Sequence, residues 1–237
     1  MDMKEDINLT KELKNILLKE GADLVGVGNL SELPKSVRYN LPIGIAVAIK
    51  YPKAVIQGIS ELPTQEYHNW YGLLNEQLDN LVTIGATFLQ KKGYQAIAKT
   101  RKQVGYYGED CITELPHKTI ATRTGIGWIG KSALLITKQY GSMVRISSIL
   151  TDAPLIPSKS INQSLCGSCT ICQSACPAKA IYGMLWNTSV KREQLFDYQK
   201  CRKMAQLRSE KGFGKPEDLC GKCIEVCPYT KRYIKQK

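Results

Sequence analysis

Two runs of cysteine near the C-terminal end constrain this chain more than any other feature of its 237 residues. The first run reads Cys166-x2-Cys169-x2-Cys172-x3-Cys176-Pro177, and the second reads Cys220-x2-Cys223-x3-Cys227-Pro228. In the first run three thiols lie along one loop, while the fourth is carried away from it, which is the spacing of iron–sulfur ligands. A structural zinc ion needs four ligands, and eight cysteines in this spacing argue against it. The pattern predicts two [4Fe–4S] clusters.

The second run lacks the first cysteine that a two-cluster ferredoxin has at that place. Cys201, on a basic stretch with helical character, supplies the missing thiol. Because the fourth cysteine of such a run binds the other cluster, the ligands are expected to cross between the runs. We predict one set of Cys166, Cys169, Cys172 and Cys227, and another of Cys176, Cys201, Cys220 and Cys223. Cys111 is then the ninth cysteine, outside both sets.

Charge and composition limit the partners that we expect. The formal net charge is +12 and the sequence pI is about 9.2. Two oxidised clusters would lower the charge to roughly +8, because metal binding deprotonates cysteine. An anionic partner such as a nucleic acid is one interpretation, and a generic basic surface is the other.

No membrane span is expected, since no apolar run reaches about 18 residues, and residues 1–6 lack the apolar region of a signal peptide. We therefore expect a cytoplasmic protein, whose thiols stay reduced.

Hydrophobic spacing and turn residues predict the main elements of the chain. Helices are expected at 9–17, within 61–92, and at 116–124. Strands are expected at 24–27, 43–49, 94–98, 134–137 and 143–150, the last two paired around Gly141. Pro154 and Pro157 mark a linker at about 152–164. We therefore expect an α+β cofactor- and substrate-binding domain at 1–160 and a double-cluster domain at 161–237.

Several segments outside the cysteine runs carry a family resemblance. They are Gly-Ile-Gly-Trp-Ile-Gly-Lys-Ser-Ala-Leu-Leu-Ile at 125–136, Ile-Leu-Thr-Asp-Ala-Pro-Leu at 149–155, Cys-Gly-Ser-Cys at 166–169 and Glu-Tyr-His at 66–68. With the spacing of Cys201, they resemble the epoxyqueuosine reductases and, more widely, the corrinoid-dependent reductive dehalogenases. The resemblance extends over residues from about 60 to 230.

This resemblance implies a nitroreductase-like α+β body that holds cobalamin, with a bacterial-ferredoxin-like module of two [4Fe–4S] clusters. It also implies that the clusters pass single electrons to cobalt for reductive chemistry on a bound substrate. An external low-potential donor of the flavodoxin or ferredoxin type would supply them. We therefore expect a cobalamin-dependent iron–sulfur reductase. Two alternatives stay open: an electron-transfer protein that serves a partner's corrinoid or flavin, and a nitroreductase-like enzyme that uses flavin mononucleotide (FMN).

The glycine-rich segment is the candidate cofactor contact. Glycine lets a backbone approach a large flat ring, and tryptophan offers a packing surface. Lys131 would meet a phosphate or propionamide group. The expected cofactor-binding residues are Gly125, Gly127, Trp128, Ile129, Gly130 and Lys131. The alternative interpretation is a tight structural turn with Trp128 in the core.

The expected catalytic residues are Asp110, Cys111 and His117. In the family an aspartate acid lies about fourteen residues before the first glycine, and that position here is Cys111, with Asp110 beside it. Either the register slips by one residue, or a thiol stands in this place. His117 is a third candidate, as a proton donor or a cobalt ligand.

The chain also departs from the family beyond the second cysteine run. It ends ten residues after Cys227, whereas full-length epoxyqueuosine reductases continue into a helical-repeat region that helps to grip tRNA. The resemblance therefore implies a short, divergent relative. Its substrate is tRNA or another molecule.

Overall fold

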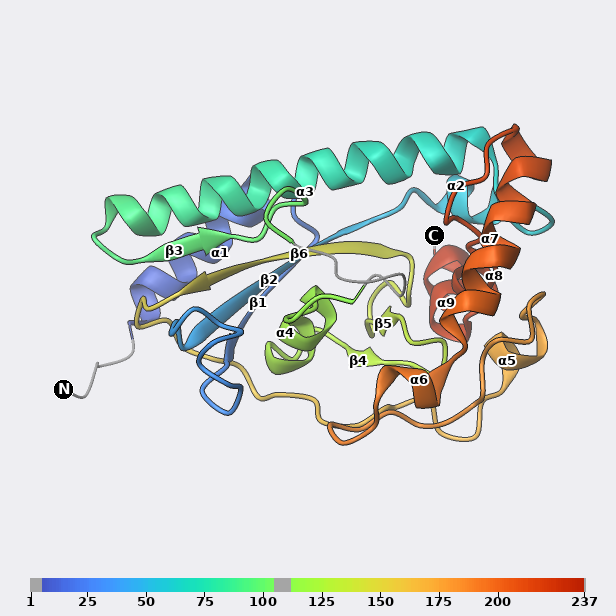
Figure 1. Ribbon diagram of the computed structural model, residues 1–237. Helices are drawn as coiled ribbons and strands as arrows, with labels where there is room; N and C mark the ends of the chain where they lie inside the picture. Colours follow the sequence, from blue (N-terminus) through green and yellow to red (C-terminus); the bar gives the residue numbers. More distant parts are fainter. Residues whose placement is uncertain (1–5, 105–111, 237) are drawn as a thin grey trace. The chain divides into compact units, whose positions relative to one another are not determined.

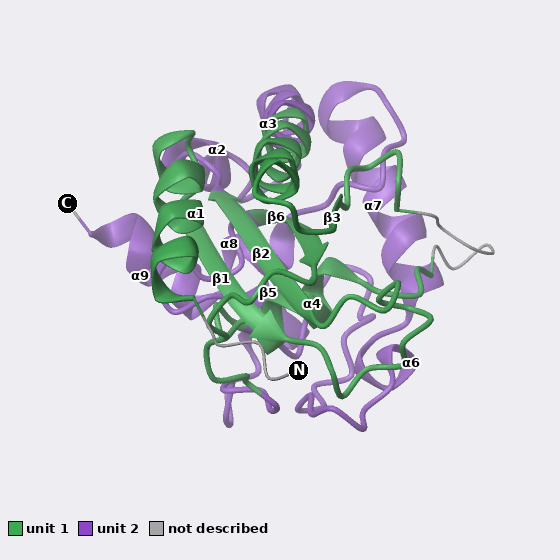
Figure 2. Ribbon diagram, turned by 90° about the vertical axis from the view of Figure 1, so that its left-hand side faces the viewer, with its two compact units in different colours: residues 1–49, 75–127, 145–161 green, residues 50–74, 128–144, 162–237 purple. Residues whose placement is uncertain are grey.

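The computed structural model describes residues 6–104 and 112–236 (Figure 1). Two of the expected catalytic residues, Asp110 and Cys111, lie outside these ranges. The chain forms two compact units, which are coloured separately in Figure 2. Unit 1 comprises Met1–Ile49, Asn75–Gly127 and Arg145–Ile161, and unit 2 comprises Lys50–Leu74, Trp128–Val144 and Asn162–Lys237. Within the described ranges, no helix combines the length and apolar character that crossing a membrane requires.

A four-stranded sheet forms the centre of unit 1, in the order β1-β2-β6-β3. Its strands are β1 (Leu24–Asn29), β2 (Ile43–Lys50), β3 (Ala96–Ala98) and β6 (Val144–Thr151). β1 and β2 are antiparallel, with Leu24 opposite Ala48, and β3 and β6 are antiparallel, with Ala96 opposite Thr151. β2 is buried along nearly its whole length, as expected for a central strand with both faces covered.

Helices cover this sheet because each presents an apolar stripe. α1 (Ile7–Lys19) begins at Asp6, whose carboxylate accepts hydrogen bonds from the main-chain N–H groups of Asn8 and Leu9. Its buried residues recur at helical spacing: Leu9, Leu13 and Leu17. α4 (His117–Arg123) packs against β1, where Gly28 allows close approach, since a Cβ atom there would lie 2.5 Å from the carbonyl carbon of Arg123.

The 27-residue helix α3 (Gln65–Lys91) contributes to both units. Residues up to Leu74 count with unit 2, and those from Asn75 onward with unit 1. Its length agrees with the apolar positions that predict a helix within 61–92. Gly93, with a φ of +90°, follows its last turn.

Unit 2 consists of short elements around a small sheet. β4 (Trp128–Ile129) pairs with β5 (Leu135–Ile136). The helices are α2 (Lys53–Gly58), α5 (Ile171–Ser174), α6 (Arg192–Leu195), α7 (Tyr198–Phe213), α8 (Lys222–Glu225) and α9 (Pro228–Lys235). One apolar cluster joins the segment after β4 to the segment around α6, through buried Ala133, Trp186 and Leu195.

One predicted pairing is wrong. Residues 134–137 and 143–150 do contain strands, but β5 pairs with β4, while β6 joins the four-stranded sheet. The reason is a reverse turn after β4: the main-chain N–H of Ala133 donates to the carbonyl of Gly130, and the N–H of Gly130 donates to the carbonyl of Leu134. This turn folds β5 back onto β4. Gly141 forms an isolated bridge with Thr137 instead of the centre of a hairpin.

Candidate iron–sulfur centre

The first cysteine run forms a tight loop followed by a single helical turn. The main-chain N–H of Cys169 donates to the carbonyl of Cys166 at 3.2 Å, and Gly167 between them adopts a φ of +54°. Cys172 lies within α5, and Cys176 follows that helix. The Sγ atom of Cys176 accepts a hydrogen bond from the main-chain N–H of Ala180 at 3.5 Å. The loop therefore directs its cysteines to different places, as a crossed ligand set requires.

The other four cysteines come from three separate helices and one loop of unit 2. Cys201 lies in the first turn of α7, which Asp197 caps by accepting from the N–H of Lys200 at 3.0 Å. Cys220 precedes Gly221, which has a φ of +73° and begins α8, and Cys223 lies within that helix. Cys227 is buried at the start of α9, directly before Pro228.

Three of the thiols have pKa values that burial and neighbouring thiols raise. Burial, followed by the thiols of Cys166, Cys227 and Cys169, raises the pKa of Cys172 to about 11. Burial, followed by the thiols of Cys176 and Cys220, raises the pKa of Cys201 to about 11. Burial, followed by the thiols of Cys220, Cys201, Cys172 and Cys176, also raises the pKa of Cys223, so Cys223 senses thiols of both predicted ligand sets. Mutual repulsion of this kind disfavours thiolates unless a metal compensates their charge, so the donor set fits bound iron.

A single metal ion and an iron–sulfur cube require different spacings of their thiol ligands. Within the part of the chain that the structure describes, no three His, Cys, Asp or Glu side chains are close enough to hold one metal ion. A tetrahedral zinc site would draw its sulfurs to within about 4 Å of one another, since each Zn–S bond is about 2.3 Å. In an iron–sulfur cube each thiolate has its own iron, so the thiols can stand farther apart.

The glycine-rich segment has local structural contacts within each unit. In unit 1, Gly125 has a φ of +73°, and a Cβ atom there would lie 2.5 Å from the carbonyl oxygen of Lys159. In unit 2, a Cβ atom on Gly130 would collide with the side chain of Ile136. Trp128 is fully buried against Tyr229, with ring centroids 5.0 Å apart. These contacts favour a structural turn, although the Trp128 indole N–H is buried without a hydrogen-bond partner among the described residues.

Lys131 contacts the cysteine loop. Its side chain is 6% exposed, and its ammonium group donates to the main-chain carbonyl of Cys169 at 2.9 Å. Ile129, from the same motif, packs partly buried against the cluster of Ala133, Trp186 and Leu195. In unit 2 the motif therefore supports the cysteine loop directly.

His117, the remaining expected catalytic residue, is the first residue of α4 in unit 1. Its Nδ1 atom lies 2.8 Å from the hydroxyl of Ser148. The pKa of His117 is lowered from 6.5 to about 4. Burial is the largest cause, the charges of Arg145 and Lys99 act in the same direction, and the charge of Asp79 opposes them. At neutral pH the imidazole is uncharged, so it is a poor proton donor but keeps a lone pair for hydrogen bonding or for a metal.

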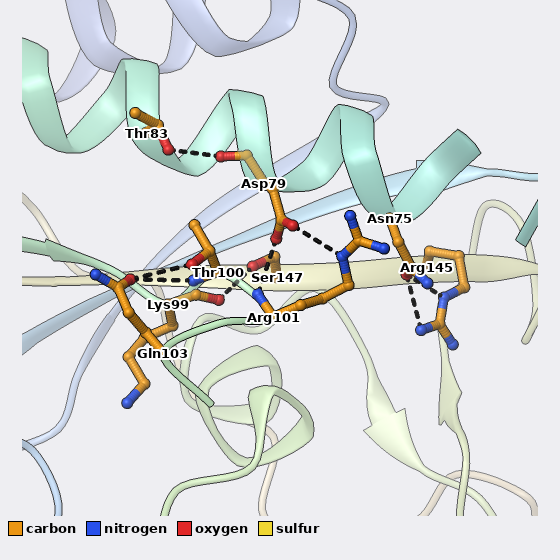
Figure 3. Close-up of polar contacts among 9 residues, drawn as sticks. All are labelled: Asn75, Asp79, Thr83, Lys99, Thr100, Arg101, Gln103, Arg145 and Ser147. Atoms are coloured by element: carbon orange, nitrogen blue, oxygen red, sulfur yellow. Dashed lines mark hydrogen bonds and ion pairs between the residues drawn. The ribbon is translucent and has the colours of Figure 1, made fainter. Parts of the chain in front are cut away.

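The surroundings of His117 form a polar cluster that the sequence analysis does not identify. Figure 3 shows it between α3, the segment after β3, and β6. Asp79 binds Arg101 through the main-chain N–H at 2.9 Å and the guanidinium at 2.8 Å. Asn75 accepts two hydrogen bonds from Arg145. Ser147 donates to the carbonyl of Lys99 at 2.9 Å.

Lys99 and Tyr39 form a further pair in unit 1. Lys99 is 6% exposed, and its ammonium group donates to the Tyr39 hydroxyl at 3.4 Å and lies 4.8 Å from the ring centroid. Tyr39 is 50% exposed and has a φ of +53°, a left-handed conformation that is unusual for an aromatic residue. Such backbone strain occurs preferentially at functional sites. A lysine directly after a short apolar strand is the one sequence signal for this pair.

Comparison with known proteins identifies the cysteine-rich part of the chain. Residues 165–230 match the model of the 4Fe-4S double cluster binding domain. In sequence, the chain is 35% identical over 128 residues to an epoxyqueuosine reductase of Bacillus cereus, covering 50% of this chain and 30% of the relative. It is 29% identical over 209 residues to that of Bacillus subtilis, covering 79% of this chain and 47% of the relative. The chain is a relative of the epoxyqueuosine reductases.

Solved structures agree on the fold. An epoxyqueuosine reductase in complex with a tRNA-Tyr stem loop matches with a TM-score of 0.63 at 22% identity, over 94% of this chain and 66% of that one. A catabolic reductive dehalogenase in complex with 3-bromo-4-hydroxybenzoic acid matches with a TM-score of 0.71 at 18% identity, over 92% of this chain and 31% of that one. The α+β fold with a double-cluster module is confirmed. The chain spans about a third to a half of the length of the curated relatives that it matches first.

Proposed function

We propose that this epoxyqueuosine reductase relative is an oxidoreductase that carries two [4Fe–4S] clusters and is cobalamin-dependent. The observation that carries this proposal is the match of residues 165–230 to a double-cluster domain. It is supported by the different thiol neighbours of Cys172 (Cys166, Cys227 and Cys169) and of Cys201 (Cys176 and Cys220). We propose one cluster on Cys166, Cys169, Cys172 and Cys227 and another on Cys176, Cys201, Cys220 and Cys223. Bound clusters supply one-electron transfer.

The protein's own contribution at the clusters is to hold and shield their ligands. Lys131 fixes the Cys169 carbonyl, and the N–H of Ala180 donates to the sulfur of Cys176. Hydrogen bonds from N–H groups to sulfur and the burial of the cluster both influence its reduction potential. Cys227 is buried, so water is largely kept from this ligand.

Cobalamin is proposed from the relatives, since one matched structure is described by its B12-dependent dehalogenation. A bound corrinoid would supply a cobalt centre that accepts single electrons. Of the expected contacts, Gly125, Gly130 and Lys131 have local partners in the protein, and Trp128 leaves a buried indole N–H unpartnered among the described residues. The cobalamin titration below is therefore the deciding test, with FMN as the alternative cofactor.

We propose Asp110, Cys111 and Tyr39 as candidate proton donors and His117 as a hydrogen-bonding group or metal ligand. Asp110, Cys111 and His117 follow from the sequence, and Tyr39 follows from the structure. Because Lys99 donates to the Tyr39 oxygen, the hydrogen of that hydroxyl is directed elsewhere and is available to another acceptor. His117, uncharged at neutral pH, would act through a hydrogen bond instead.

An RNA substrate and a low-potential electron donor complete the proposal. A related reductase has been seen with a tRNA stem loop, and the positive net charge of this chain suits a nucleic acid. A small flavodoxin or ferredoxin would supply the electrons. A modified nucleotide within an RNA loop is the substrate class that we propose.

Anaerobic reconstitution with iron and sulfide tests the ligand sets. The wild-type protein is expected to bind about eight irons per chain, and Cys201→Ser to lose about half of them or to hold one damaged cluster. Cys111→Ser is the matched control, because it also removes one thiol but leaves both proposed sets complete. Equal iron content in Cys201→Ser and wild type would contradict the assignment, as would loss of iron in Cys111→Ser.

Titration of the reconstituted protein with cobalamin tests the enzyme. Binding, followed by cobalt reduction that depends on the clusters in absorbance and paramagnetic resonance spectra, supports the reductase. Full iron content without cobalamin binding would reject it and leave an electron carrier or a flavin enzyme. Titration with FMN then separates those two.

A further inference from the structure

A basic and aromatic surface surrounds the last helix of unit 2. We call it the α9 surface. Its cations are Lys50, Lys53, Lys138, Arg232 and Lys235. Three of them, Lys50, Lys53 and Arg232, lie over the half-buried rings of Tyr140, Tyr233 and Tyr229. These residues come from the end of β2, from α2, from the segment after β5, and from α9, so the fold gathers charges that are far apart in the sequence.

Contacts run continuously through this surface. The Lys50 ammonium lies 5.3 Å from the Tyr140 ring centroid, and that ring meets Tyr233 edge-on at 4.9 Å. The Lys53 ammonium lies 4.7 Å from the Tyr233 centroid. The Arg232 guanidinium lies 4.8 Å from the Tyr229 centroid and donates to the Lys138 carbonyl at 2.8 Å. Lys50, Lys53 and Arg232 are therefore held at defined positions by rings or a main-chain carbonyl, and Lys138 and Lys235 are their neighbours in the chain or across this contact.

The ring and carbonyl contacts of Lys53 and Arg232 orient these two cations without cancelling their charge. A ring face or a carbonyl attracts a cation but carries no formal negative charge. The nearby carboxylate of Glu225 is taken by Lys222 and Lys231, which are not among the five cations. Arg232, Lys138 and Lys235 are exposed. The surface thus presents a dense positive charge to a partner.

We propose that the α9 surface binds the phosphate backbone of an RNA loop or stem, an inference that rests on the RNA substrate proposed above. Lysine and arginine positioned a few ångströms apart neutralise successive phosphates and release their counter-ions. Guanidinium and ammonium groups are the side chains that contact phosphate in this way. The surface therefore supplies affinity and placement for a substrate whose chemistry takes place elsewhere.

The same contacts indicate that this surface does not recognise bases. Cations lie over the faces of Tyr229 and Tyr233, and Tyr140 is engaged by Lys50 and by Tyr233. Trp128 packs edge-on against Tyr229 from the interior. Stacking of bases needs open ring faces. Recognition is therefore of the backbone and independent of base sequence.

The test measures RNA binding by the reconstituted holoprotein, with a fluorescently labelled, unmodified anticodon stem-loop RNA and anisotropy across a range of salt concentrations. Lys53→Gln combined with Arg232→Gln removes two charges from the α9 surface. Lys203→Gln combined with Lys211→Gln removes two exposed charges from α7 in the same unit and is the matched control. A stem-loop of scrambled base sequence tests the second claim.

The α9 double variant is expected to bind about tenfold more weakly or worse. It should also lower the slope of log K against log salt by about 1.4 to 1.8, since each phosphate contact contributes about 0.7 to 0.9. The α7 variant should retain near wild-type affinity, and the scrambled RNA should bind within about threefold. Equal losses in both variants, a strong base preference, or no RNA binding at all would overturn the proposal.

Slower electron uptake from a flavodoxin in the α9 variant, without an effect on RNA binding, would assign the surface to an acidic protein and also overturn the proposal. Iron content and cobalamin reduction are measured on the same samples. RNA binding lost with the α9 charges in a protein that fails to reduce cobalamin would reject the reductase and leave this surface standing. RNA binding that is unchanged in the α9 variant, in a protein that does reduce cobalamin, would overturn the RNA-binding role of this surface and leave the proposed reductase standing.

Discussion

The ammonium group of Lys131 donates a hydrogen bond to the main-chain carbonyl of Cys169 at 2.9 Å, although 38 residues separate the two in sequence. The lysine is 6% exposed, so its charge is held almost entirely away from water by the protein. It belongs to the glycine-rich segment, where a role in holding a cofactor's phosphate or amide was the expectation. This hydrogen bond joins the glycine-rich segment to the cysteine loop. Loss of the bond is therefore expected to affect the first proposed cluster most directly.

Replacing Lys131 by methionine is therefore expected to weaken the first cluster. The change keeps the length and apolar stem of the side chain but leaves the part-buried Cys169 carbonyl without its donor, a loss of about 1 kcal/mol for an ordinary hydrogen bond. Iron release to a chelator should be faster than in wild type, and the first cluster should be lost before the second. Lys203→Met, on the exposed face of α7, controls for the loss of one charge. Unchanged iron retention in Lys131→Met would show that Lys131 does not stabilise the first cluster.

Gly141 offers a stability test within unit 2. It has a φ of +61°, and a Cβ atom there would lie 2.7 Å from the Cα atom of Thr230 and closer still to its main-chain N. Gly141→Ala should therefore cost more than the roughly 1–2 kcal/mol that the left-handed conformation alone imposes on alanine. Denaturant unfolding of the holoprotein, followed by tyrosine and tryptophan fluorescence, measures the difference.

Gly214 is the matched control for this substitution. It ends α7 with a φ of +77°, and no described atom lies within 4 Å of the place where its Cβ would be. Gly214→Ala should show the conformational cost alone. If the two variants lose the same free energy of unfolding, the contact between Gly141 and α9 does not constrain the backbone.

The parts of the fold that local chemistry determines were predictable. The spacing of Leu9, Leu13 and Leu17 located α1, and Gly93 marked the end of α3, because amphipathic period and left-handed glycine act within a few residues. The double-cluster module was predictable because the cysteine spacing reflects the chemistry of the ligands themselves. The pairing partner of β5 was not predictable, because a reverse turn at Gly130 and Ala133 decides it. Ala133 adopts a φ of +58°, a conformation that an alanine in a sequence does not predict.

The pairing of Lys99 with Tyr39 and the charge state of His117 in unit 1 could not be predicted from the sequence. Lys99 and Tyr39 are 60 residues apart, and the pair exists because the end of β3 and the loop before β2 meet in three dimensions. Neither residue belongs to a motif with a fixed spacing. His117 was a visible candidate, but its charge state depends on burial and on Arg145 and Lys99, which only the folded chain brings to it.

Tyr39→Phe tests the proton donor that the structure adds. The change removes the hydroxyl and keeps the ring beneath the Lys99 ammonium, so packing should be largely preserved. If Tyr39 delivers the proton, turnover should fall by roughly 10²–10⁴-fold, the usual contribution of general acid catalysis. Iron content and cobalamin reduction should be unchanged. Tyr182→Phe, an exposed tyrosine in unit 2, is the control, and equal turnover in both variants would exclude Tyr39 from the chemistry.

His117 should make unit 1 sensitive to acid between about pH 4 and 6.5. Burial lowers its pKa from 6.5 to about 4 in the folded protein, so the unfolded chain takes up a proton in this range that the folded chain refuses. The stability contributed by uncharged His117 is therefore complete above about pH 6.5 and is lost as the pH falls towards 4, by about 3 kcal/mol at most. His117→Gln keeps a hydrogen-bonding group for Ser148 but cannot titrate. The difference in unfolding free energy between wild type and this variant should rise from pH 4 to 6.5 and then level off. A difference that stays constant across this range would show that the folded protein accommodates a charged imidazole beside Arg145 and Lys99.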